Sequence, residues 1–162
     1  MSQAQQVREF TTESNPDIKY PTRPTPLNLA ETKFIVRMIM SELDELITTV
    51  TSSSDERDSV MMECVNTRDR CNKFDYKTKN ELLAAQYDAF VDSHYYSLNC
   101  AAKKGVNLDS IFKVVHDANM RKRDTKTGKF IRRDDGKIQK PEGWCEPDII
   151  GEIARQLKDG AF

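Results

Sequence analysis

The chain has 162 residues, 31% of them charged, and its 25 lysines and arginines nearly balance 26 aspartates and glutamates, for a formal net charge of −1. This length is sufficient for one domain with a hydrophobic core. The near-neutral charge excludes a general attraction to nucleic acid or membranes, and no apolar run reaches the roughly eighteen residues of a transmembrane helix. Because residues 1–10 also lack the apolar stretch of a signal peptide, we expect a cytoplasmic protein without a membrane partner.

Several common kinds of site are absent from the sequence. The four cysteines show no CxxC spacing, which predicts free thiols and neither a disulfide framework nor a zinc site. Only two histidines occur, so a histidine-rich transition-metal centre is excluded. Neither GxGxxG nor GxxxxGK[ST] is present, and the chain therefore has no Rossmann phosphate loop and no P-loop.

The N-terminal half of the chain predicts an arm followed by helices. Four prolines between positions 16 and 26 predict an extended arm over 1–28, with one short helical turn near 7–10. Asn28 is a suitable N-cap for a helix over about 29–50. After a polar break, helical spacing of apolar residues predicts a second helix over 56–72 and a third over 77–104.

The C-terminal half begins with another helix and continues as a basic tail. Asn107 or Asp109 caps a helix that runs to about residue 123. Turn signals in the basic segment 124–147, including Asp135-Gly136, predict a loop or a small hairpin, and a short helix over 148–157 follows. The pattern predicts an all-α fold, a helical bundle of four to five helices in a single domain over 1–162.

Two pairs of carboxylates stand at helical spacing. Glu42 and Glu45 are three residues apart, and Asp88 and Asp92 are four apart, so each pair shares one face of its helix. At about 100° per residue, both pairs fall inside apolar faces instead of on polar ones. Converging carboxylates repel each other unless a cation lies between them. One interpretation is a shared Mg²⁺ site, since Mg²⁺ prefers oxygen ligands; the alternatives are solvated surface pairs or a buried hydrogen-bond network.

The basic tail and the helix before it form a second candidate site. His116, Asn119 and Lys122 recur every three residues, so they share a helix face. Three interpretations fit the basic residues that follow: a solvated loop, a nucleic-acid patch, or cations that bind phosphates opposite an acidic metal site. Aromatic residues for base stacking are sparse along this segment, so we do not expect a nucleic-acid partner.

Two stretches of the tail carry a family resemblance. VHDANMRKRD and DDGKIQKPEGWCEPDI resemble the VHxSNMxK and DGKxxKPxGWxxPDI motifs in one branch of the all-α nucleoside triphosphate pyrophosphohydrolases. This superfamily includes MazG-type enzymes, dimeric dUTPases and phosphoribosyl-ATP pyrophosphohydrolase. The upstream motifs agree in the same order: VREF, PTRPTPLNL, ExxE, DxxxDxxYY and GVNLDSIFKVVH. The resemblance covers nearly the whole chain.

The resemblance implies a function and a set of site residues. It implies a helical homodimer, or a dimer of dimers, that hydrolyses a nucleoside triphosphate between the α- and β-phosphates, with nucleotide-pool house-cleaning as one role. It implies Mg²⁺ as cofactor, with Mn²⁺ as a substitute. By position, the catalytic and metal-binding carboxylates are Glu42 and Glu45, joined at the metal by Asp88 and Asp92. The phosphate-binding residues are Asn119, Lys122, Lys137 and Lys140.

One position departs from the family pattern. The first acidic motif of the family often begins with two glutamates, and Ser41 stands where the first of them is expected. This leaves the motif one carboxylate short. The alternative hypothesis is therefore a non-catalytic helical module of the same fold that binds nucleotide or metal without hydrolysing it.

Overall fold

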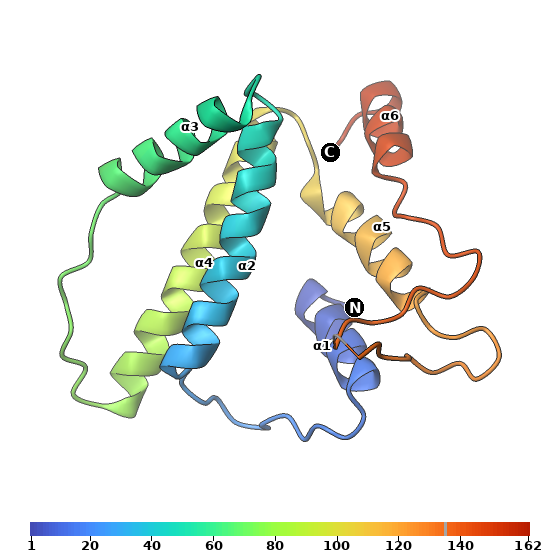
Figure 1. Cartoon of the computed structure of the whole chain (residues 1–162), viewed down its shortest axis with the longest axis horizontal. Helices are drawn as coiled ribbons and strands as arrows, with labels where there is room; N and C mark the ends of the chain where they lie inside the picture. Colours follow the sequence, from blue (N-terminus) through green and yellow to red (C-terminus); the bar gives the residue numbers. More distant parts are fainter. Residues whose placement is uncertain (135) are drawn as a thin grey trace. The chain divides into compact units, whose positions relative to one another are not determined.

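The computed structural model describes residues 1–134 and 136–162 and shows an all-α chain (Figure 1). Its helices are α1 (Gln3–Ser14), α2 (Leu29–Thr48), α3 (Ser54–Thr67), α4 (Lys79–Lys103), α5 (Leu108–Met120) and α6 (Ile149–Asp159). The predicted all-α, helical-bundle class is confirmed, with six helices in the described residues instead of four to five. The four cysteines are free thiols, as predicted.

Helix α1 is the main difference from the sequence prediction. It replaces the first half of the extended arm expected over 1–28. A capping box starts it: the Gln5 backbone N–H donates to the Ser2 hydroxyl (3.3 Å), and the Ser2 N–H donates to the Gln5 side-chain oxygen (2.7 Å). The first proline of the chain, Pro16, comes only after the helix has ended. The proline-rich arm is thus confined to the residues between α1 and α2.

The chain divides into two compact units, one made of residues 1–22 with 90–162 and the other of residues 23–89. The boundary falls inside α4. Each unit has its own internal contacts, and the prediction of a single domain over 1–162 stays a prediction.

In the 23–89 unit, α2 packs against α3. Asn28 caps α2 as predicted, through a hydrogen bond from the Glu31 N–H (3.0 Å). Asp44 of α2 pairs with Arg57 of α3 at 3.3 Å. The arm before α2 is fixed to α4 because the Leu27 backbone exchanges two hydrogen bonds with the Gln86 side chain (2.8 and 3.0 Å).

In the other unit, α5 packs against both α1 and α6. The buried Gln156 side chain of α6 fixes the start of α5, because it bonds both the N–H and the carbonyl of Asn107 (2.9 and 3.0 Å). Hydrogen bonds from Arg155, and then from Ser110 and Gln156, lower the pKa of Glu152 to about 2. This carboxylate therefore remains charged at neutral pH, and it fixes the polar side of α6.

The tail between α5 and α6 contains two isolated antiparallel bridges, Arg123 with Phe130 and Arg132 with Ile138. They correspond to the small hairpin that the turn signals predict, although the described part of the tail forms no regular strand. The predicted turn at Asp135 lies outside the described residues. Farther along, the Trp144 indole N–H donates to the Ala118 carbonyl at 2.9 Å, which anchors the tail to α5.

Candidate functional site

The acidic pairs lie on α2 and α4 as predicted, and all four carboxylates are exposed. Glu42 and Glu45 belong to the 23–89 unit; Asp88 and Asp92 lie on successive turns of α4, on either side of the boundary between the units. Helical geometry brings the members of each pair onto one face. Within residues 1–134 and 136–162, however, no group of three or more His, Cys, Asp or Glu side chains is positioned to hold a metal ion.

The apolar residues around these carboxylates are also exposed. On α2, Leu43 is 46% and Leu46 is 63% exposed; on α4, Val91 and Tyr95 are 63% and 68% exposed. Burying apolar surface contributes about 25 cal/mol of stabilising free energy for each Å², and these exposed side chains do not make that contribution. Exposed apolar surface that is bordered by polar groups is typical of an interaction site.

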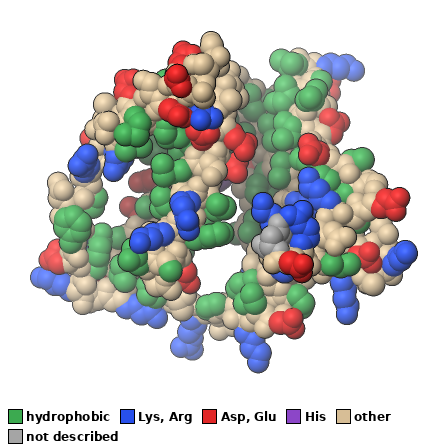
Figure 2. All heavy atoms as spheres, in the orientation of Figure 1, with side chains coloured by type: hydrophobic (Ala, Val, Ile, Leu, Met, Phe, Trp, Pro, Cys, Tyr) green, Lys and Arg blue, Asp and Glu red, His purple; other side chains and the backbone are tan. Residues whose placement is uncertain are grey.

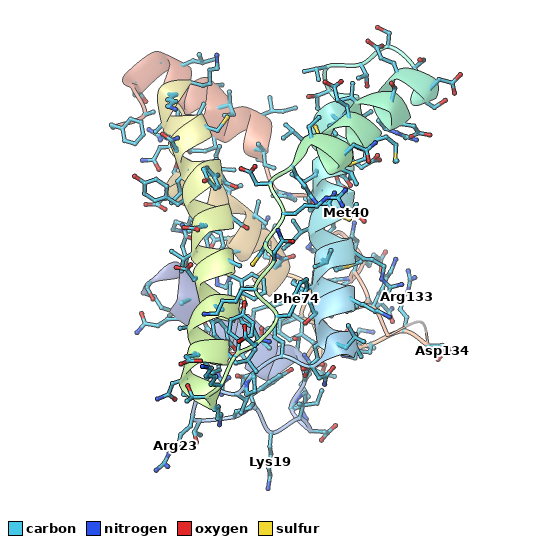
Figure 3. All side chains as sticks on the ribbon, turned by 90° about the vertical axis from the view of Figure 1, so that its left-hand side faces the viewer. Lys19, Arg23, Met40, Phe74, Arg133 and Asp134 are labelled. Atoms are coloured by element: carbon cyan, nitrogen blue, oxygen red, sulfur yellow. The ribbon has the colours of Figure 1, made fainter. Side chains whose placement is uncertain are left out.

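Ser41, the position that departs from the family motif, lines a cavity of about 590 Å³ in the 23–89 unit. The cavity lies between α2 and α3, and Phe34, Met38, Met40 and Met61 provide its apolar walls. Figure 3 shows Met40 on the part of α2 that lies beside α3. The Ser41 hydroxyl donates to the Arg37 carbonyl at 3.1 Å, so it is satisfied within its own helix.

Three of the four predicted phosphate-binding residues line one basic pocket of about 600 Å³ in the unit that contains α1 and α5. They are Lys122, Lys137 and Lys140. Arg132 and Arg133 add two further cations to the pocket wall. The fourth predicted residue, Asn119, lies beside the pocket and accepts a hydrogen bond from the Lys122 ammonium at 2.7 Å. Figure 2 shows lysine and arginine side chains gathered over the tail, and Figure 3 shows where Arg133 projects from it.

Trp144 positions two of the pocket's lysines. The ammonium nitrogen of Lys140 lies 4.1 Å from the centre of the indole ring, and that of Lys122 lies 5.4 Å from it. Cations are attracted to the face of an aromatic ring at these distances. Burial, together with the charge of Lys140, lowers the pKa of Lys122. Two like charges that are held close together in this way favour the binding of an anion between or beside them.

The end of α1 forms another wall of the basic pocket through Phe10, Thr11, Ser14 and Asn15. Arg132 ties the tail to this end, since its guanidinium donates to the Ser14 carbonyl (3.3 Å) and to the Asn15 side chain. The expectation of an extended arm over 1–28 does not include this wall, since α1 forms it. The spacing of Ser2 and Gln5, which is that of a capping box, is the signal that could have revealed the helix.

The all-α fold, the paired carboxylates and the lysine-lined pocket define a helical protein with groups suited to phosphate compounds. The sequence matches the family model "Phosphoribosyl-ATP pyrophosphohydrolase" over residues 8–119, which is more than half of the chain. The chain therefore belongs to this pyrophosphohydrolase family. The matched range contains both carboxylate pairs and Asn119, whereas the lysines of the basic pocket lie beyond it.

The fold is also similar to a solved structure. A candidate NTP pyrophosphohydrolase from Exiguobacterium sp. 255-15, solved at 1.78 Å, superposes with a TM-score of 0.78 at 22% sequence identity. The similarity covers 98% of each chain and shows a shared fold. No curated protein is similar enough in sequence to count as a match. Among the described helices of the chain, none combines the length and apolar character needed to cross a membrane.

Proposed function

We propose that the chain is a Mg²⁺-dependent nucleoside triphosphate pyrophosphohydrolase, which releases a nucleoside monophosphate and pyrophosphate by cleavage between the α- and β-phosphates. The observation that carries this proposal is the family match, because it spans both carboxylate pairs. The description of the structural neighbour as a candidate NTP pyrophosphohydrolase supports a triphosphate substrate. Such an activity fits a role in nucleotide-pool house-cleaning.

The four carboxylates are the metal-binding groups in this proposal. Glu42, Glu45, Asp88 and Asp92 offer the oxygen ligands that Mg²⁺ prefers, and Mn²⁺ can replace it at such ligands. Their exposure leaves them accessible to a metal that arrives with phosphates. A bound Mg²⁺ supplies charge that offsets the phosphate oxygens. Glu42 or Glu45 also accepts the proton of the attacking water, as a general base.

The basic pocket binds the phosphates of the leaving pyrophosphate. Lys122, Lys137 and Lys140 line one cavity of this unit, and ammonium groups form strong, charge-assisted hydrogen bonds with phosphate oxygens. Asn119 holds the Lys122 ammonium in place through its side-chain oxygen. The lysines thus act on the leaving group, while the carboxylates act on the metal and on water.

The direct test is pyrophosphate release from a panel of nucleoside triphosphates that includes dUTP and dCTP. We expect release with Mg²⁺ or Mn²⁺ and none after EDTA treatment, with activity restored when metal is added back. The nucleotide product from each substrate should be a nucleoside monophosphate, because cleavage occurs between the α- and β-phosphates. Release of inorganic phosphate with a diphosphate product would contradict the proposed cleavage site.

We also propose that the chain works as a homodimer or as a dimer of dimers. Apolar residues stay exposed on more than one side of α2, including Phe34 at 58% and Leu46 at 63%. A second copy can cover such surface, and a stable interface needs about 800 Å² from each partner. Light scattering should then give a mass of twice or four times 18.6 kDa. A mass of 18.6 kDa at micromolar concentration would exclude the dimer.

The second candidate function is a non-catalytic module that binds nucleotide or metal. Ser41 favours it, because the first carboxylate of the family motif is missing there. Calorimetry beside a turnover assay separates the two functions. Heat of nucleotide binding without pyrophosphate release supports the module, whereas release supports the enzyme.

A further inference from the structure

Trp144 lies next to two cavities of the unit that contains α1, α5 and the tail. The first is the basic pocket of about 600 Å³, and the second is a cavity of about 380 Å³ that Trp144 itself lines. Lys122 and Lys140 line the first cavity, while their sequence neighbours Arg121 and Pro141 line the second. The half-buried indole therefore forms part of the wall of the second cavity, and its ring contacts two lysines that line the first.

The second cavity, which we call the Trp144 cavity, has the chemistry of a site for a flat heteroaromatic ring. Its volume falls within the range of about 300–1,000 Å³ that small-molecule sites occupy. The indole offers a surface on which a ring can stack. Thr125, Arg121 and Glu142 also line the cavity, and side chains of these types supply both hydrogen-bond donors and acceptors.

The lining groups differ in how free they are to meet a ligand. The Arg123 guanidinium is engaged by Glu13, at 3.0 Å from its Nε, and also lies 5.6 Å from the Phe130 ring centre. The indole is fixed by its bond to the Ala118 carbonyl, so it forms a rigid wall. Arg121 and Glu142 are exposed. The guanidinium can donate hydrogen bonds to acceptors on the edge of a bound ring, and the carboxylate can accept them from its donors.

We propose that the Trp144 cavity is the nucleobase subsite, in which the base stacks on the indole while the phosphates of the same nucleotide reach the lysines across its edge. This subsite rests on the proposed function, because its ligand is the nucleotide that the enzyme would bind. One residue then serves both ends of the substrate: its ring binds the base and positions Lys122 and Lys140 for the phosphates.

Trp144 is the only tryptophan of the chain, so its fluorescence reports on this site in the intact protein. AMP and CMP should change the emission and bind about 10-fold more tightly than ribose 5-phosphate, which carries the same phosphate without a base. Pyrophosphate should affect the emission only through the lysines, so AMP added to the pyrophosphate-saturated protein should produce a further change. Equal affinity and equal emission changes for AMP and ribose 5-phosphate would overturn the proposal.

Variants test the same site by calorimetry. Trp144→Leu should reduce the tenfold preference for AMP over ribose 5-phosphate to about one, and Trp144→Phe, which keeps an aromatic face, should restore part of it. Arg121→Gln should change the ratio of AMP to CMP affinity and leave pyrophosphate affinity unchanged. Lys129→Gln, an exposed change on the same tail, is the matched control. If Trp144→Leu does not fold, an unchanged AMP-to-CMP ratio in Arg121→Gln still contradicts the proposal.

The test of the nucleobase subsite can fail or succeed independently of the pyrophosphate-release test of the proposed function. Pyrophosphate release without a base-dependent change of Trp144 emission would refute the subsite and leave the activity standing. A base-dependent emission change without pyrophosphate release would support the subsite and refute the enzyme.

Discussion

Replacing Glu45 by glutamine should lower the rate of pyrophosphate release by about 100-fold or more, while helical content and thermal stability stay close to those of the unchanged chain. An amide binds Mg²⁺ more weakly than a carboxylate does and cannot accept the proton of an attacking water. Removing a group that stabilises transition-state charge typically costs 100- to 1,000-fold in rate. Glu45 is exposed, so the substitution should change the free energy of unfolding by no more than about 0.5 kcal/mol.

A matched control separates this effect from a general loss of negative charge. Glu63 is also an exposed glutamate on a helix of the 23–89 unit, and it lies outside both acidic motifs. Glu63→Gln should therefore keep full activity. Circular dichroism and steady-state rates on both variants provide the comparison. Full activity in Glu45→Gln would show that this carboxylate has no catalytic or metal-binding role.

Local signals account for the parts of the fold that the sequence predicts well. Asn28 stops the arm and caps α2 because its side chain accepts the Glu31 N–H, an interaction that needs only neighbouring residues. Gly105 follows the end of α4 with a φ of 72°, a conformation that glycine adopts without strain. Boundaries set by such short-range bonds can be read from the sequence alone.

Long-range contacts account for what the sequence does not predict. Arg132 reaches the Ser14 carbonyl across more than a hundred positions, and Arg123 pairs with Glu13 over a similar separation. No local pattern encodes these bonds, so the sequence does not predict that the tail packs against the end of α1. The carboxylate pairs show the same contrast between local and long-range information. Periodicity places Glu42 and Glu45 on one face of α2, but it does not say what covers that face.

Replacing Lys122 by glutamine should weaken pyrophosphate binding by about 10- to 100-fold. Hydrogen bonds to charged groups contribute about 1.5–3 kcal/mol, and each 1.4 kcal/mol is a factor of ten in affinity. Glutamine keeps a donor near Asn119 but carries no charge. Calorimetric titration with pyrophosphate measures the loss. Lys129→Gln removes an exposed lysine of the same tail that does not line the basic pocket, and this variant should bind pyrophosphate as tightly as the unchanged chain.

The pH dependence identifies the lysine responsible. Burial, and then the charge of Lys140, hold the pKa of Lys122 below its ordinary value of 10.5. An anion binds the protonated ammonium, so affinity is full well below that lowered pKa and falls as the pH rises through it. The wild-type chain should therefore lose pyrophosphate affinity at a lower pH than a chain whose lysine had the ordinary pKa of 10.5. Lys122→Gln should bind weakly at every pH and lack this early decline, while a decline that persists in the variant would assign it to another lysine.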